Sequence, residues 1–142
     1  MAELFIPESD ADIDACFPAY LALRPHLQRG QFVAQIRRQQ AQGFRIVALR
    51  EAGVVVSIVG FRLAEFTAWG RIVYIDDLST LPDCRLQGHG GRLLDWVADH
   101  ARSQGCAAVH LDTGYARHAA HRLYLDRGYV LASHHMSLAL SG

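Results

Sequence analysis

The sequence has no lysine: all fourteen of its basic residues are arginine, and they balance fourteen acidic residues. Without a lysine the chain cannot form a Schiff base with a substrate, and it cannot carry the phosphate-binding loop that ends in Gly-Lys-Ser/Thr. A formal net charge of zero gives no overall attraction to nucleic acid or to an anionic membrane. We therefore expect neither of these as a partner.

Cysteines and long apolar runs are also scarce. The three cysteines, Cys16, Cys84 and Cys106, include no C-x-x-C pair, so the sequence predicts neither a disulfide framework nor a structural zinc site. The longest apolar stretch, Val54–Phe61, is too short to cross a bilayer. The first residues lack the basic region and apolar run of a signal peptide, so we expect a cytoplasmic protein.

The hydrophobic periodicity predicts one α/β domain over residues 1–142, in the order β-α-α-β-β-β-α-β-α-β. Strands grouped in the middle of the chain favour a mixed central sheet with helices on both faces. The predicted strands are Leu4–Ile6, Phe44–Arg50, Val54–Phe66, Arg71–Thr80, Ala107–Leu111 and Tyr129–Leu140. The predicted helices are Ala11–Leu23 (with an irregularity at Pro18), Gln31–Gln42, Gly88–Gln104 and Arg117–Arg127.

A glycine-rich turn, residues 83–92, lies between a predicted strand and the most regular predicted helix. The first backbone N–H groups of a helix have no intrahelical partner, and the helix dipole adds positive potential there. Gly88, Gly90 and Gly91 allow a ligand to approach the backbone, and Arg85 and Arg92 can donate charge-assisted hydrogen bonds. The turn therefore predicts a phosphate or pyrophosphate site, with a turn that binds nothing as the alternative.

The run Arg85–Gly90, R-x-x-G-x-G, resembles the coenzyme A pyrophosphate motif of the GNAT superfamily of N-acyltransferases. The segment Arg117–Tyr129 is similar to the N-x-x-A-x-x-L-Y-x-x-x-G-[FY] helix of that superfamily, except that Arg117 stands in place of the asparagine. The resemblance implies a GNAT-like fold, acetyl-CoA as co-substrate and no metal. The cofactor contacts that it implies are Leu78, Ser79 and Thr80 through their backbone, and Arg85, Leu86, Gln87, Gly88, His89, Gly90, Gly91, Arg92, Arg117 and Tyr124.

Adjacent acids, Asp76 and Asp77, interrupt a strand that otherwise looks buried. Acetylation needs a neutral amine, and deprotonating an amine with the pKa of a lysine at pH 7 costs roughly 4–5 kcal/mol. Neighbouring strand residues face opposite sides, so both acids enter one cleft only if a bulge redirects one of them. The pair resembles that of diamine (spermidine/spermine-type) acetyltransferases. This resemblance implies Asp76 as the base and Asp77 as a substrate contact or structural acceptor, with the choice between them open.

Tyr124 is the predicted general acid, because a phenol stays protonated at neutral pH and can protonate the departing thiolate. Asp76, Asp77 and Glu65 favour a small cationic acceptor amine, such as a polyamine, an aminoglycoside or a lysine side chain. We expect the N-terminal helices and the loop Leu21–Gln31 to form the acceptor site.

The alternatives are a protein or peptide N-acetyltransferase and a catalytically silent acyl-CoA-binding module, and the resemblance also allows a homodimer. His118 and His121 are spaced i, i+3 without a third ligand, so we predict no metal.

Overall fold

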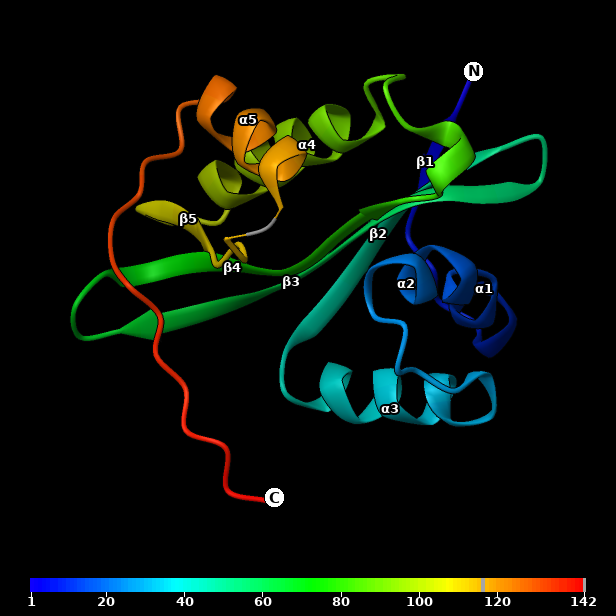
Figure 1. Cartoon of the computed structure of the whole chain (residues 1–142), viewed down its shortest axis with the longest axis horizontal. Helices are drawn as coiled ribbons and strands as arrows, with labels where there is room; N and C mark the ends of the chain where they lie inside the picture. The colour runs from blue at the N-terminus through cyan, green and yellow to red at the C-terminus, as the bar shows by residue number, and fades with distance from the viewer. Residues whose placement is uncertain (116, 142) are drawn as a thin grey trace. The chain divides into compact units, whose positions relative to one another are not determined.

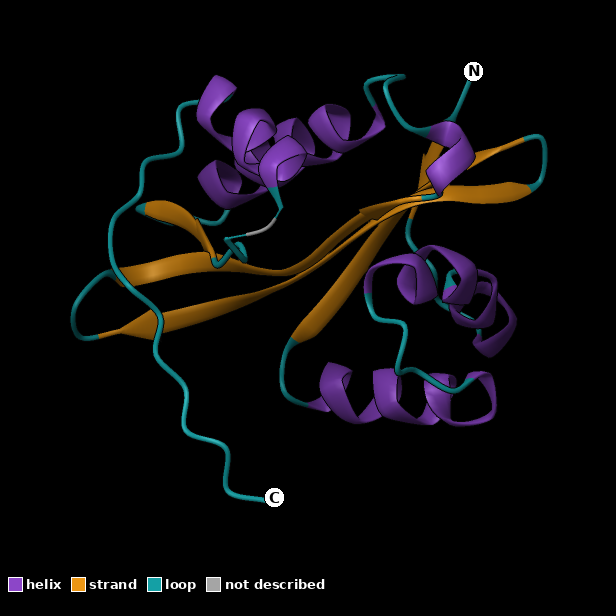
Figure 2. Cartoon of the chain, viewed as in Figure 1, coloured by secondary structure: helices purple, strands orange, loops and turns teal. Residues whose placement is uncertain are grey.

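A mixed five-stranded sheet organises the chain (Figures 1 and 2). The computed structural model describes residues 1–115 and 117–141, which form two compact units, residues 1–111 and 112–142. The sheet lies in the first unit, in the order β1-β2-β3-β4-β5. Its strands are β1 (Glu3–Phe5), β2 (Phe44–Glu51), β3 (Val54–Phe66), β4 (Gly70–Thr80) and β5 (Ala108–Leu111). Neighbours from β1 to β4 are antiparallel, and β5 is parallel to β4.

Helices cover both faces of this sheet, as the sequence predicts. In Figure 1 the helices α1, α2 and α3 lie on one face of the sheet and α4 lies on the other. The three are α1 (Asp10–Ala15), α2 (Phe17–Leu23) and α3 (Arg29–Ala41), and α4 spans His89–Ser103 after the short 3₁₀ turn Pro82–Cys84. On α4, Leu93, Leu94 and Val97 are buried, because they recur along one side of the helix. Within the described residues, no helix has the length and apolarity needed to cross a membrane.

The predicted helix over Ala11–Leu23 divides into α1 and α2 at Cys16. Pro18 lies in the first turn of α2, where its missing N–H is tolerated. The second helix ends at Arg24, which precedes Pro25, because a proline disfavours helical backbone in the residue before it. This ending positions the Arg24 side chain at the sheet.

A β-bulge in the β3–β4 ladder redirects the acidic pair. Gly60 pairs with Asp77 and Phe61 pairs with Ile75, so Asp76 is an extra residue on β4. Such a residue bends its strand and changes the direction of the neighbouring side chains. The sequence predicts that both acids can enter one cleft only if a bulge redirects one of them, and this bulge is present.

The second unit holds α5 (His118–Asp126). None of the described residues beyond Asp126 lies in a helix or strand, so the predicted strand Tyr129–Leu140 is wrong. Apolar and polar residues alternate there, but alternation makes a strand only where a neighbour supplies backbone hydrogen bonds. Among the described residues this segment pairs with no strand, and Val130, Met136 and Leu138 are exposed.

Candidate active site

The cradle, as we call residues 85–92 of the glycine-rich turn, follows the 3₁₀ turn Pro82–Cys84 and includes the first turn of α4. Gly88 is the N-cap of α4 and has a φ of 83°. This left-handed backbone conformation is strained for any residue that carries a Cβ. Leu86 also has a positive φ of 63°, and its side chain is fully exposed. Because no capping side chain bonds to the first turn of α4, its backbone N–H groups remain available to an anion.

The two arginines of the cradle, Arg85 and Arg92, differ in the hydrogen bonds that they donate. The Nε of Arg85 donates to the Thr80 carbonyl at 3.4 Å, and its other guanidinium nitrogens have no hydrogen bond within the described part of the chain. Nη1 of Arg92 donates to the carbonyl of Ala2 at 2.5 Å, which ties α4 to the N-terminal segment. Arg85 is therefore the better placed of the two to bind a phosphate.

The side chain of His89 does not face solvent, although the sequence places it beside a bound phosphate. It is 8% exposed, and its Nε2 lies 3.9 Å from a carboxylate oxygen of Glu51. The first turn of α4 buries one side against the sheet, and His89 and Gly91 are on that side. Because the imidazole of His89 is buried, only its backbone N–H is available to a ligand. Gln87 is exposed and Gly90 is half-buried.

The end of β4 offers backbone groups, as the resemblance implies. Pairing with β5 covers Ile72–Ile75, so among the described residues the stretch 76–80 has no neighbouring strand on that side. The Ser79 hydroxyl donates to the Ala19 carbonyl at 2.6 Å, and the Ser57 hydroxyl lies 2.7 Å from that of Thr80. Leu78 is buried. The side chain of Ser79 thus ties α2 to the sheet. The backbone edge of this stretch, which has no neighbouring strand, is the part available to a ligand.

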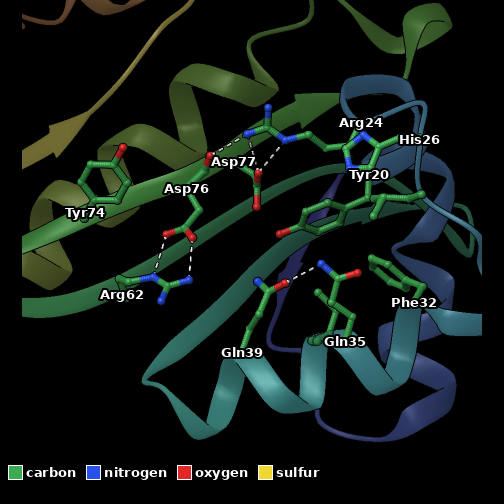
Figure 3. Close-up of a pocket in the computed structure, with 12 residues that line it drawn as sticks. Tyr20, Arg24, His26, Phe32, Gln35, Gln39, Arg62, Tyr74, Asp76 and Asp77 are labelled. Carbon is green, nitrogen blue, oxygen red and sulfur yellow. Dashed lines mark hydrogen bonds and ion pairs between the residues drawn. The ribbon is translucent and has the colours of Figure 1, made fainter. Parts of the chain in front are cut away.

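Both acids line a pocket of about 460 Å³ on the face covered by α1–α3 (Figure 3). This size is typical of small-molecule sites. We call it the acceptor pocket, and its other lining residues are Tyr20, Arg24, His26, Leu27, Phe32, Gln35, Ile36, Gln39, Arg62 and Tyr74. The predicted loop Leu21–Gln31 contributes three of them. Glu65 is exposed near the end of β3, pairs with Arg71 and does not line this pocket.

Each carboxylate of the pocket is paired with an arginine (Figure 3). Nε of Arg62 donates to Oδ1 of Asp76 at 3.0 Å, and Nη2 donates to Oδ2 at 2.6 Å. Arg24 donates from Nε and Nη2 to Oδ1 of Asp77, at 3.0 and 2.8 Å. Oδ2 of Asp77 accepts no hydrogen bond of standard geometry within the described residues. Among the described residues it is therefore the one oxygen of the two acids that accepts no hydrogen bond from an arginine.

Burial raises the pKa of Asp77 above its usual value, although its hydrogen bonds from Arg24 oppose this rise. The buried Tyr20 hydroxyl points toward the acids and has no hydrogen bond of standard geometry among the described residues (Figure 3). Burial and the nearby Asp77 charge raise the pKa of Tyr20 well above its usual value, so the phenol stays protonated. Gly60 lies next to the Tyr20 hydroxyl and the Phe44 ring, and a Cβ at this position would collide with both.

Two predicted site residues lie in the second unit. Tyr124 is buried on α5, with its ring centroid 5.8 Å from that of Tyr129. Arg117 is the exposed N-cap of α5. Their approach to the cradle and to the acids stays a prediction. The described residues contain no group of three or more metal-ligating side chains.

The sequence reasoning missed Tyr20, Arg24 and Arg62. Arg62 had a signal, because it is the only basic residue in the long, mostly apolar strand β3, and a partly buried charge needs a partner. Arg24 had a weaker one in the proline that follows it. Tyr20 had none, since it looks like any aromatic residue of a helix core.

Comparisons with known proteins bear on the family and the fold of the chain. Residues 10–129 match the model of the acetyltransferase (GNAT) family. A Bacillus subtilis relative, named as an uncharacterized N-acetyltransferase YhdJ, is 30% identical over 120 residues, which cover 83% of this chain and 84% of the relative. An aminoalkylphosphonate N-acetyltransferase of Salmonella typhimurium is 38% identical over 66 residues, 46% of this chain and 43% of that protein.

Solved structures share the fold. An acetyltransferase from Trypanosoma brucei superposes with a TM-score of 0.80 at 22% identity, covering 99% of this chain and 100% of the other. The structure of AAC(6')-Iy with the bisubstrate analog CoA-S-monomethyl-acetylneamine has a TM-score of 0.83 at 13% identity, covering 100% and 99%. The chain therefore belongs to the acetyltransferase (GNAT) family and is an acetyl-CoA-dependent N-acetyltransferase.

Proposed function

We propose that the protein transfers an acetyl group from acetyl-CoA to the primary amine of a small acceptor, which enters the acceptor pocket as an ammonium cation. The observation that carries the proposal is the continuity of β4. One stretch of this strand, residues 76–80, bears both pocket carboxylates and the unpaired edge that leads to the cradle. In this proposal a single strand carries the proton acceptor and leads directly to the cofactor site, so that one domain holds both.

The cradle fits the pyrophosphate of coenzyme A. The open first turn of α4 and the exposed Arg85 would hold the phosphates, and the backbone of Leu78–Thr80 would hold the pantetheine arm. Bound acetyl-CoA supplies a thioester carbon for direct attack by the amine within a ternary complex. Holding both reactants in the site would contribute much of the rate.

We infer that Asp77 takes the ammonium proton, in preference to the Asp76 that the resemblance implies. Both oxygens of Asp76 already accept hydrogen bonds from Arg62, whereas Oδ2 of Asp77 has none of standard geometry among the described residues. Burial also raises the pKa of Asp77 toward the working range of a general base. Asp76 and Arg62 would then hold the wall of the pocket.

Tyr124 remains the proposed general acid for the departing thiolate. Removing its hydroxyl in Tyr124→Phe is expected to lower kcat by about 100-fold, the lower range for general acid catalysis. Acetyl-CoA affinity, measured by calorimetry, should change little. Equal turnover in both proteins would remove Tyr124 from the mechanism.

The first experiment is calorimetric titration with acetyl-CoA, beside the Arg85→Ala/Gly90→Asp double variant. We expect one-to-one binding that the variant loses, because the aspartate places negative charge where phosphates would lie. The same samples, given a panel of small amines and a thiol reagent, should release free coenzyme A only in the wild type.

The alternatives predict other results. A silent acyl-CoA-binding module would bind acetyl-CoA and release no coenzyme A with any amine. An enzyme that acetylates proteins or peptides would act on peptide amines and leave small amines untouched. A well-folded wild type that does not bind acetyl-CoA would refute our interpretation of the cradle.

A further inference from the structure

The charges that line the acceptor pocket are already balanced. Arg24 and Arg62 carry two positive charges, Asp76 and Asp77 carry two negative charges, and each pair is joined by two hydrogen bonds of 2.6–3.0 Å. The side chain of Asp77 is 10% exposed and that of Asp76 is 22% exposed. A substrate therefore meets a partly buried site with a formal charge of zero.

A charge brought into such a site needs a partner there. A diamine or polyamine brings several positive charges, and both carboxylates are already neutralised by arginine. An amine that carries its own anionic group adds no net charge. Charge balance thus favours a zwitterion over a polycation.

The pocket also has hydrogen-bond donors to spare. Within the described part of the chain, Nη1 of Arg24 and Nη1 of Arg62 donate no hydrogen bond. Guanidinium groups bind planar carboxylates and phosphonates well. An anionic ligand group can therefore bind Arg62 while Arg62 keeps its pair with Asp76.

We propose that the acceptor is a small zwitterion, whose anionic group binds the unused Nη1 of Arg62 and whose amine faces Oδ2 of Asp77. The chemical class is an amine with a carboxylate or phosphonate a short chain away. This proposal rests on the proposed function, because it names the substrate class of the same pocket. It differs from the polyamine, aminoglycoside and lysine acceptors that the acidic strand suggests.

Three matched acceptors test it: β-alanine, its amide, and trimethylenediamine. All three present a primary amine on a short chain, which ends in a carboxylate, a neutral amide or a second ammonium group. With acetyl-CoA saturating, kcat/KM is measured from coenzyme A release. We expect β-alanine to exceed the diamine by about tenfold or more, with the amide between them.

The outcomes separate the two proposals. If the diamine matches or exceeds β-alanine, the zwitterion proposal is overturned and the N-acetyltransferase proposal stands. If acetyl-CoA binds and none of these amines nor their longer homologues is acetylated, both proposals fail. Aminoethylphosphonate in place of β-alanine shows whether the donors prefer a phosphonate to a carboxylate.

A charge variant tests the cause of the preference. Arg62→Gln leaves the pocket with a formal charge of −1, so the ratio of kcat/KM for β-alanine to that for the diamine should fall about tenfold. This ratio does not depend on the fraction of folded enzyme, and Arg24→Gln provides a second reading. Arg102→Gln, which removes an exposed pair with Asp99 on α4, should leave the ratio unchanged. An unchanged ratio in both pocket variants would overturn the proposal.

Discussion

Strand β4 carries the two acids of the acceptor pocket and leads toward the cradle. The two sites are nevertheless built from different parts of the chain. The cradle is a contiguous turn, and the groups that we propose to bind the ligand are mostly its backbone N–H groups. The pocket is assembled from side chains of α2, α3, β3 and β4, and its ion pair between Arg24 and Asp77 joins residues 53 positions apart. One site depends on backbone conformation, and the other depends on charges held by packing. Substitutions should therefore be able to damage each site separately.

Asp77→Asn is expected to have the largest effect, and it should affect the pocket alone. The amide cannot take a proton from the ammonium group, so kcat should fall by about 100-fold or more. Acetyl-CoA affinity should stay close to that of the wild type, because the cradle keeps its backbone.

Asp76→Asn is the matched control, since it removes an adjacent carboxylate of the same pocket. Its loss of kcat should be smaller, because Asp76 already uses both oxygens on Arg62. Steady-state kinetics of both variants at saturating acetyl-CoA makes the comparison. A larger loss in Asp76→Asn would return the role of base to Asp76.

Gly60→Ala should disturb the packing that supports the pocket. The added Cβ would lie 2.5 Å from Cζ of Phe44 and would also contact the Tyr20 hydroxyl. Both side chains are buried and have little room to move, so the free energy of unfolding should fall by about 1–3 kcal/mol. Urea denaturation measures this change. Gly30→Ala on α3 is the control, because nothing lies within 4 Å of its added Cβ and no loss is expected.

Gly88→Ala should weaken the cradle and leave the pocket intact. Its φ of 83° is costly for alanine by roughly 1–2 kcal/mol, so the turn should relax and bind acetyl-CoA about tenfold less tightly. Gly105→Ala is the matched control: it has φ 71° and similarly open surroundings, beyond the other end of α4. Calorimetry should show weaker binding in the first variant alone. Equal weakening in both would mean that the change reflects general instability.

The difference between the sites also explains what the sequence can predict. The cradle is a local pattern of glycines before an amphipathic helix, so its position follows from residues 83–104 alone. The pocket depends on the bulge at Asp76, which the pairing of β4 with β3 sets, and on the ion pair between Arg24 and Asp77, which are far apart in the sequence. Local periodicity predicts the strands of the sheet, and it fails for Tyr129–Leu140, where no described strand lies alongside to pair with it.

The smallest predicted effect concerns the Tyr20 hydroxyl and the proton affinity of Asp77. Burial raises the pKa of Asp77, while the facing phenol of Tyr20 lowers it by favouring the carboxylate form. In Tyr20→Phe this help is lost, so the pKa of Asp77 should rise further, by a fraction of a pH unit.

Carbon NMR of the aspartate side chains, titrated with pH, measures this shift directly, and Asp77→Asn assigns the resonance. Because the raised pKa belongs to the folded state, the protonated form is the one that folding favours, and ionisation of Asp77 lowers stability as the pH rises through that pKa. The Tyr20→Phe protein should lose this stability at a slightly higher pH. A shift in the opposite direction would show that the phenol of Tyr20 does not donate toward Asp77.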